Sequence, residues 1–381
     1  MAIAIYRNAS SWSVGLIFFF LNLCFGSWLS RLPEIQGYLH LSDAQLGWVL
    51  LGMPLGAIIS TTFSRHLLQR VSPGKLALIS ISIFTMTMVL PGLASTGLFL
   101  AILLFSAGLS DGLTNVTMNT AASDLERQSG VNIMSSCHGM FSLGGFAGAL
   151  IGGLLGRFGI DLWVQLLGIA LLCLLVLWPR RASLWDIPSE VSGEKQKMRW
   201  PSLRLLTYMV IGICVMIGEG AISDWSAIYL SANLGAGPFV AALGFAGFSA
   251  AAAAGRFSGD WVRKLVTPKV LLRNGSVFSS IGLLLSILVP SPGFAILGFT
   301  MAGIGFATSV PILFLEAAKL NPKHPGIGIA AVANAGIVGF LGAPPLIGFI
   351  SEHFGMEKAL GMLATLALIA AVLSHFSFKK I

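Results

Sequence analysis

Residues 12–32 read WSVGLIFFFLNLCFGSWLSRL, an apolar stretch in which the one charged side chain, Arg31, comes next to last. An α-helix rises 1.5 Å per residue, so a run of about 20 residues crosses the roughly 30 Å hydrocarbon core of a bilayer. The stretch therefore predicts a membrane-spanning helix.

Eleven further apolar runs follow, separated by polar or Pro/Gly breaks. The twelve predicted spans are 12–32, 44–67, 75–94, 97–124, 131–156, 160–179, 204–231, 238–263, 269–290, 292–317, 325–351 and 357–377. The second span begins at a capping box, Ser42-Asp43-Ala44-Gln45, in which the first and last side chains each bond the other's backbone N–H. The pattern indicates an all-α membrane protein with twelve transmembrane helices.

The composition agrees with lipid as the main solvent. Of the 381 residues, 55% are hydrophobic and 10% are charged, whereas soluble proteins carry about 25% charged residues. The chain has no HExxH motif, and its four cysteines fall in apolar runs without metal-site or disulfide spacing. These features exclude a soluble enzyme, and we expect no catalytic activity, metal or cofactor.

The basic residues predict how the chain is oriented. If the N-terminus is cytoplasmic, 20 of the 23 Lys and Arg residues fall on the cytoplasmic side, leaving only Arg31, Arg157 and Lys358 outside. Positive charge collects in cytoplasmic loops, so both termini are predicted to be cytoplasmic. The net charge of +8 is thus explained by topology and does not indicate nucleic-acid binding.

A long polar stretch, 179–203, separates six spans from six. We therefore divide the chain into an N-terminal six-helix bundle (1–178), a cytoplasmic linker (179–203) and a C-terminal six-helix bundle (204–381).

Internal matches indicate that the two bundles are repeats. Val71-Ser72-Pro73 matches Val266-Thr267-Pro268 at an offset of 195 residues, and Phe158-Gly159 matches Phe354-Gly355 at an offset of 196. The second offset also pairs His138 with Asn334. Six-plus-six parallel repeats are a known arrangement of secondary transporters.

The stretch 255–264, GRFSGDWVRK, makes the resemblance specific, because it looks like the GRxxGDxxGRR signature of the major facilitator superfamily. Val262 departs from the usual Gly, and the first-half equivalent is degenerate, with Arg65 where Asp260 stands. The resemblance implies two pseudo-symmetric bundles that alternate access across the membrane. It implies gating roles for four residues of this signature, namely Arg256, Gly259, Asp260 and Arg263.

A narrower resemblance is carried by WLSRLP at 28–33, MN at 118–119, SSCHG at 135–139, EGAISDW at 219–225 and GAPP at 342–345. These motifs are similar to a bacterial inner-membrane subgroup akin to the fucose permease branch. The resemblance implies a multi-pass protein of the bacterial inner membrane, and we expect it to be a monomer.

Three acids lie deep within the predicted spans, away from their ends, namely Asp111, Glu219 and Asp224. A charge at the centre of a spanning helix costs about 2.5–3.5 kcal/mol on insertion scales. Each of these acids therefore indicates either a function or a stabilising partner. Asp111 shares a helix face with Asn115 and Asn119, which follow at i+4 and i+8. This polar stripe is predicted to be a substrate or proton site, as the fucose permease resemblance favours, since that branch places a coupling acid in helix 4. The alternative is a structural network that holds helix 4 to a neighbour.

Glu219 lies between Gly218 and Gly220, which weaken a helix and allow it to bend beside the carboxyl. Hydrocarbon favours the neutral acid, so the group can exchange a proton. The alternative is a permanently protonated carboxyl bonded to a carbonyl. Asp224 and Trp225, further out, either line the outer cavity or form an outer-leaflet cap with an interfacial Trp.

Four more residues are candidates for substrate binding, namely Trp28, Arg31, His138 and Asn334. His138 can relay protons, where its repeat partner Asn334 can only hydrogen-bond, although a lone His is often a packing residue. Arg31 could receive an anionic group, or it could pair with Glu34 at the outer rim. Trp28 could stack on a sugar or ring, or anchor the chain in lipid.

Two sequence features predict helix packing and gating. Small residues at three- and four-residue spacing let helices approach closely. They occur in helix 5 (Gly144, Gly145, Gly148, Gly152, Gly153, Gly156) and in helix 11 (Gly336, Gly339, Gly342, Gly348). Pro344 and Pro345 are predicted to bend helix 11, which could then serve as a gate.

These observations favour a secondary transporter that moves a small polar solute together with a proton, using Asp111, Glu219 or both as the proton-exchanging acids. An exporter or antiporter, an uncoupled facilitator, and a membrane sensor that has lost transport stay open as alternatives. The degenerate first-half signature is the one observation that favours the sensor.

Overall fold

The computed structural model describes residues 8–185, 187, 202–320 and 325–377, without the side chains of Asp260 and Pro325. Most of the predicted linker lies outside these ranges. Within them the secondary structure is helical, and no strand occurs.

The helices of the first six spans are joined by short turns. They are α1 (Ala9–Leu29), α2 (Leu32–Tyr38), α3 (Asp43–Leu50), α4 (Gly52–Leu68), α5 (Pro73–Thr87), η2 (Leu90–Leu93), α6 (Gly97–Ser129), α7 (Met134–Arg157), α8 (Leu162–Leu177), η3 (Trp178–Arg180) and α9 (Arg181–Trp185). We call this part of the chain the first half.

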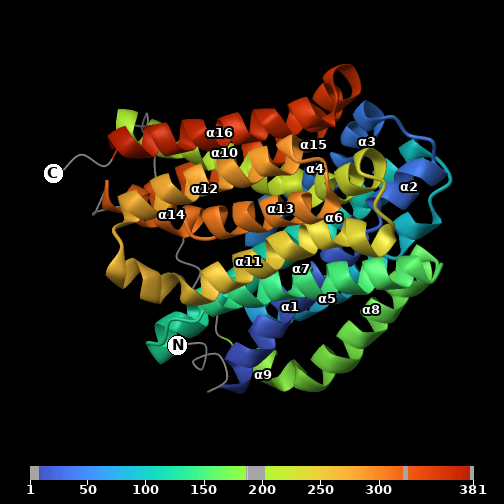
Figure 1. Cartoon of the computed structure of the whole chain (residues 1–381). Coiled ribbons are helices and arrows are strands. Elements are labelled where there is room, and N and C mark those ends of the chain that lie inside the picture. Colours follow the sequence, from blue (N-terminus) through green and yellow to red (C-terminus); the bar gives the residue numbers. More distant parts are fainter. Residues whose placement is uncertain (1–7, 186, 188–201, 321–324, 378–381) are drawn as a thin grey trace.

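The second half contains α10 (Leu203–Ile228), the π-helical turn η4 (Tyr229–Asn233), α11 (Pro238–Leu265), α12 (Pro268–Leu288), α13 (Pro292–Phe306), α14 (Ser309–Lys319), α15 (Pro325–Phe354) and α16 (Met356–Ser377). As Figure 1 shows, the long helices of both halves run roughly along one direction.

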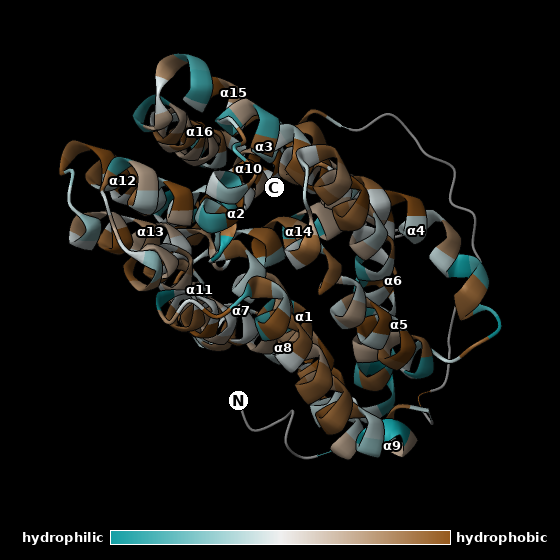
Figure 2. Cartoon of the chain, turned by 90° about the vertical axis from the view of Figure 1, so that its right-hand side faces the viewer, coloured by the Kyte–Doolittle hydropathy of each residue, from teal (hydrophilic) through white to brown (hydrophobic). Residues whose placement is uncertain are grey.

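Twelve helical segments in the described ranges are long and apolar enough to cross a membrane, which confirms the predicted number. Figure 2 shows hydrophobic residues over most of the helical surface and hydrophilic ones gathered at helix ends such as α9. Two of the predicted spans divide into two α-helices: the second between α3 and α4 at Leu51, and the tenth between α13 and α14. The predicted capping box is also confirmed, because Ser42 N–H donates to Gln45 Oε1 (2.9 Å) and Gln45 N–H donates to Ser42 Oγ (3.3 Å).

The start of α1 and the end of α16 lie at the same end of the molecule, which we call the terminal end (Figure 1). At this end α9 packs against neighbouring helices: Ser183 Oγ lies 2.8 Å from Ser13 Oγ, and Lys75 Nζ lies 5.1 Å from the Trp185 ring centroid. The turn between α2 and α3 lies at the other end, which we call the opposite end.

One contact between the halves runs along α7 and α11. A Cβ on Gly153 would come within 2.4 Å of Ala242 Cβ, and one on Gly139 would come equally close to the Phe257 ring. Glycine thus allows this close approach, as small-residue packing predicts.

A second contact between the halves joins α3 to α15. A Cβ on Gly47 would lie 2.5 Å from the Pro344 carbonyl oxygen, and one on Gly348 would lie 2.4 Å from the Asp43 carbonyl oxygen. Within α4, the terminal-end part of the same span, most side chains from Ile58 to Leu67 are exposed. The second span therefore packs closely on α15 through α3, at the opposite end.

Candidate functional site

The candidate site is centred on an ion pair between Glu219 of α10 and Arg256 of α11. Arg256 Nη2 lies 3.4 Å from Glu219 Oε2, and the two side chains are 18% and 13% exposed. The other carboxylate oxygen, Glu219 Oε1, is buried and has no hydrogen-bond partner among the described residues. The ion pair is therefore mostly shielded from water, and its N–O separation is long. One carboxylate oxygen lacks a hydrogen bond, although buried polar groups usually have one.

Arg256 also connects the two halves of the chain. Its Nη1 donates to Ser142 Oγ of α7, and its backbone carbonyl accepts a hydrogen bond from Ser135 Oγ at 2.9 Å. Ser142 in turn donates to the carbonyl of His138 one turn earlier, at 3.3 Å. One guanidinium thus bonds a carboxylate of the second half and a hydroxyl of the first.

The signature residues occupy different places around this pair. All of 255–264 is helical, within α11. From the sequence we placed Arg256 among the basic residues of the cytoplasmic side. In the structure its side chain forms an ion pair with Glu219. Gly259 is buried and a Cβ there would touch only Thr308 at 3.6 Å, while Arg263 is partly buried. The side chain of Asp260 lies outside the description.

His138 lies beside the pair. Its ring packs edge-to-face on Phe18 of α1, with centroids 5.4 Å apart, and its backbone carbonyl accepts a hydrogen bond from Ser142, which also bonds Arg256. Asn334, its predicted repeat partner, is exposed on α15. The arrangement supplies an imidazole near an ion pair, as a proton relay needs, but within the described residues no hydrogen bond to the ring is present.

The predicted polar stripe of α6 is present. Asn115 Nδ2 donates to Asp111 Oδ1 (2.9 Å) and Asn119 Nδ2 donates to the carbonyl of Asn115 (2.8 Å). All three side chains are partly buried. Their hydrogen-bond partners lie within α6, so among the described residues the stripe makes no hydrogen bond that holds α6 to a neighbour and none to Glu219.

Glu219 does not interrupt its helix. We expected Gly218 and Gly220 to let the chain bend or unwind there, but α10 stays α-helical from Leu203 to Ile228. The two glycines instead provide space for aromatic rings, since a Cβ on Gly218 would meet Phe306 at 2.9 Å and one on Gly220 would meet Phe340 at 3.1 Å. Ring packing therefore explains these glycines.

Asp224 and Trp225, two turns of helix or less beyond Glu219, are more deeply buried. Asp224 is 6% exposed and Trp225 is fully buried, and the indole Nε1 has no partner in the described part of the chain. A carboxyl with no hydrogen bond among those residues is costly unless it is protonated or binds something absent here. The burial of Trp225 excludes the interfacial position that we considered.

Arg31 and Trp28 are each 1% exposed. Arg31 donates to both oxygens of Glu34, at 2.5 and 2.8 Å, to Gln165 Oε1 at 2.7 Å and to the Ile160 carbonyl at 2.8 Å. The predicted pair with Glu34 is thus present, and four of the five N–H donors of the guanidinium are engaged. Trp28 belongs to the core and does not face lipid.

We expect Arg31→Met to lower stability by about 3 kcal/mol, because the Gln165 and Ile160 oxygens would be left without their donor in a buried site. Thermal unfolding of detergent-purified protein followed by tryptophan fluorescence measures the loss. Arg157→Met is the matched control, since Arg157 is exposed and its loss should change stability by less than about 0.5 kcal/mol. Equal stability of the two variants would contradict a structural role for Arg31.

The two prolines of helix 11 lie inside α15, which continues through them. Each removes a backbone donor, and Pro344 faces α3, where its carbonyl approaches Gly47. They therefore lie at the contact between the halves.

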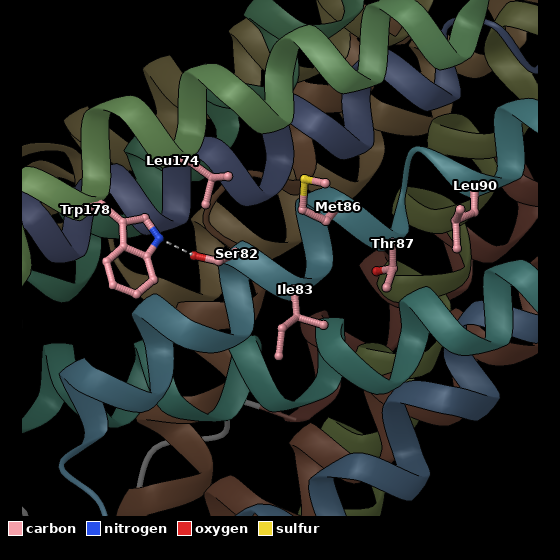
Figure 3. Close-up of a pocket in the computed structure, with 7 residues that line it drawn as sticks. All are labelled: Ser82, Ile83, Met86, Thr87, Leu90, Leu174 and Trp178. Carbon is pink, nitrogen blue, oxygen red and sulfur yellow. Dashed lines mark hydrogen bonds between the residues drawn. The ribbon is translucent and has the colours of Figure 1, made fainter.

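A separate groove, drawn in Figure 3, has a volume of about 590 Å³ and lies between α5 and α8. It is lined by Ser82, Ile83, Met86, Thr87, Leu90, Leu174 and Trp178. Trp178 Nε1 donates to Ser82 Oγ at 3.2 Å, and four of the apolar side chains are exposed. The groove is apolar and shares no residue with the ion-pair site, which is typical of a lipid-facing surface.

Sequence reasoning missed several of these partners. Ser142 and Gln165 belong to none of the motifs noted in the sequence. Ser142 could have been found from its position, because it follows His138 at i+4 on the same helix face. Ser135 was noted only as part of a motif.

Twelve helices long enough to span a membrane, in two halves that are joined at Arg256 by hydrogen bonds to Ser142 and Ser135, are typical of a membrane transporter. Residues 12–336 match the family profile of the Major Facilitator Superfamily, and the chain belongs to that family.

Curated relatives agree with this assignment. An uncharacterized MFS-type transporter of Yersinia pestis is 30% identical over 94% of this chain and 93% of its own length. The uncharacterized transporter y4wD of Sinorhizobium fredii is 31% identical over 93% of this chain and 95% of its own.

Solved structures share the fold. A variant of the nucleoside transporter NupG superimposes with a TM-score of 0.79 at 14% identity, covering 98% of this chain and all of that one. The D-xylose-proton symporter gives a TM-score of 0.70 at 17% identity, covering 97% of each chain.

Proposed function

We propose that the chain is a secondary active transporter that moves a small polar solute across the bacterial inner membrane by alternating access, in symport with a proton. The observation that carries the proposal is the Glu219–Arg256 pair, because Arg256 bonds both halves at once. The structural likeness to a D-xylose-proton symporter is consistent with this coupling.

The geometry supports a simple coupling step. When Glu219 is ionised it attracts Arg256, and both charges are compensated in a mostly dry site. Protonation of Glu219 removes that attraction, so Arg256 keeps Ser142 as its partner and becomes available to the solute. Protonation thereby weakens a contact within the second half and leaves the Arg256–Ser142 contact between the halves. Such a change in the relative stability of contacts is what a proton-coupled population shift requires.

Asp111 is the second proposed proton carrier. It is partly buried, and Asn115 is its hydrogen-bond partner. With Asn115 and Asn119 it offers acceptors and donors that suit a hydroxyl-bearing solute. This helix 4 acid also supports the finer proposal that the chain lies near the fucose permease branch.

The orientation and division of the chain are further parts of the proposal. We infer that the terminal end is cytoplasmic and that 1–178 and 204–381 move as two bundles around the α7–α11 contact, with 179–203 as linker and a single copy as the working unit. The close packing of α3 on α15 with an exposed α4 favours a state open to the cytoplasm.

A thermal-shift screen of sugars, organic acids, nucleosides and peptides on detergent-purified protein tests the function. A stabilising solute is then reconstituted in proteoliposomes, where its uptake is measured with and without an inward pH gradient. Gradient-driven accumulation supports symport, gradient-independent equilibration supports a facilitator, and the absence of any stabilising solute favours the sensor.

The ion pair itself is tested without a solute. We expect Arg256→Met to lower stability by about 3 kcal/mol, because it leaves the buried Glu219 carboxylate without its cation. Adding Glu219→Gln to that variant should recover much of the loss, and the double-mutant cycle measures the coupling. Lys264→Met, at an exposed site of the same helix, is the control. Strictly additive losses would show that the pair is not energetically coupled.

A further inference from the structure

Two Ser–acid dipeptides face each other at the opposite end of the molecule. Ser42-Asp43 stands at the start of α3, and Ser351-Glu352 stands near the end of α15. Ser42 Oγ donates to Glu352 Oε2 at 2.6 Å, while Ser351 Oγ donates to Asp43 Oδ2. Each half therefore contributes one hydroxyl donor and one carboxylate acceptor. We call these four residues the Ser–acid clasp.

Each carboxylate of the clasp has a second donor. Glu352 Oε2 also accepts the backbone N–H of Ala44 at 2.8 Å, so a side chain of the second half caps a helix of the first. A negative charge at a helix N-terminus is further favoured by the helix dipole. Asp43 Oδ1 accepts a hydrogen bond from Gln36 Nε2 of α2 at 2.6 Å, which holds the carboxylate in place.

The clasp lies where the backbones of α3 and α15 approach each other closely. Gly47 and Gly348 each lie where a Cβ would come within 2.5 Å of a carbonyl oxygen of the other half. Any larger residue there must push the helices apart, because the obstructing atoms are backbone.

We propose that the Ser–acid clasp is the gate of the opposite end, which holds that end closed while the terminal end is open. The inference deepens the proposed function, on which it rests. Its bonds join α3 to α15, and both must separate if a solute is to enter between the halves from that side. The bonds to Glu352 are exposed, whereas the bond from Ser351 to Asp43 is partly buried. Hydrogen bonds contribute little net energy, and those in exposed sites are readily replaced by water, so the clasp can open thermally.

Distances between spin labels test the gate without a solute. One pair of introduced cysteines, at Tyr38 and Phe354, reports on the opposite end; a second, at Leu67 and Ile329, reports on the terminal end. All four positions are exposed, whereas the four native cysteines are buried. Pulsed electron-spin resonance of the labelled full chain in lipid nanodiscs gives the populations of short and long distances.

Ser351→Ala with Glu352→Ala removes the contribution of α15 and leaves the capping box of α3 intact. We expect the population with a long distance at the opposite end to rise about tenfold relative to the closed one. Gly348→Leu should produce the same change by steric obstruction. Gly342→Leu is the control on the same helix, because a Cβ there meets nothing within 4 Å.

Unchanged distances in both the Ser351→Ala, Glu352→Ala variant and the Gly348→Leu variant would overturn the gate. Widening at the opposite end with an unchanged terminal-end distance would support the clasp as the closure but contradict rocking of the halves, and so the alternating-access proposal. The two failures are therefore distinguishable.

Discussion

Glu219→Gln is expected to abolish concentrative uptake while leaving solute exchange intact. One pH unit across the membrane is worth about 1.4 kcal/mol per proton, so a one-proton symporter accumulates its solute about tenfold. Gln keeps the shape of the side chain but cannot load and unload a proton. The variant should therefore bring the solute only to equal concentrations on both sides.

The measurement is uptake and counterflow in proteoliposomes, with the solute that the thermal-shift screen identifies. Glu357→Gln is the matched control, because Glu357 is an exposed acid of the same half, and it should retain the tenfold ratio. Tenfold accumulation by Glu219→Gln would remove Glu219 from the coupling role and leave Asp111 as the candidate.

Gly144→Leu is expected to destabilise the fold strongly and to lower the yield of folded protein. A Cβ at Gly144 would lie 2.1 Å from the backbone carbonyl oxygen of Phe19, so α1 and α7 would have to separate. Overpacking costs typically 1–3 kcal/mol and more where backbone must move, so we expect a loss of about 3 kcal/mol or more. Gly168→Leu, at an exposed position with open space around it, should be tolerated.

The yield of monodisperse protein on size-exclusion chromatography, with thermal unfolding of what is recovered, measures this difference. If both leucine variants purify equally well, close packing does not explain the glycines of helix 5.

Those glycines also show where sequence reasoning succeeds. Spacing along one helix predicts which residues share a face, and Gly144 and Gly148 both pack on α1 as the small-residue pattern indicates. The same local logic predicted the twelve spans, the capping box at Ser42 and the stripe from Asp111 to Asn119. Each depends on contacts within a turn or two of helix.

Contacts between helices could not be predicted in this way. Arg256 and Glu219 lie on different helices 37 residues apart, and Ser42 and Glu352 are 310 residues apart. Hydropathy gives the depth of a residue but not which neighbouring helix it faces, and each of these bonds depends on that rotation. The same limit applied to Gly218 and Gly220, whose aromatic neighbours come from α13 and α15.

The central claim is that Glu219 loads and unloads a proton beside Arg256. Infrared difference spectra of the protein in lipid, recorded across a pH step, detect a protonated carboxyl directly by its C=O stretch. We predict a band that titrates in the physiological range, disappears in Glu219→Gln and shifts its titration in Arg256→Met. A spectrum in which Glu219→Gln removes no titrating band would contradict the account.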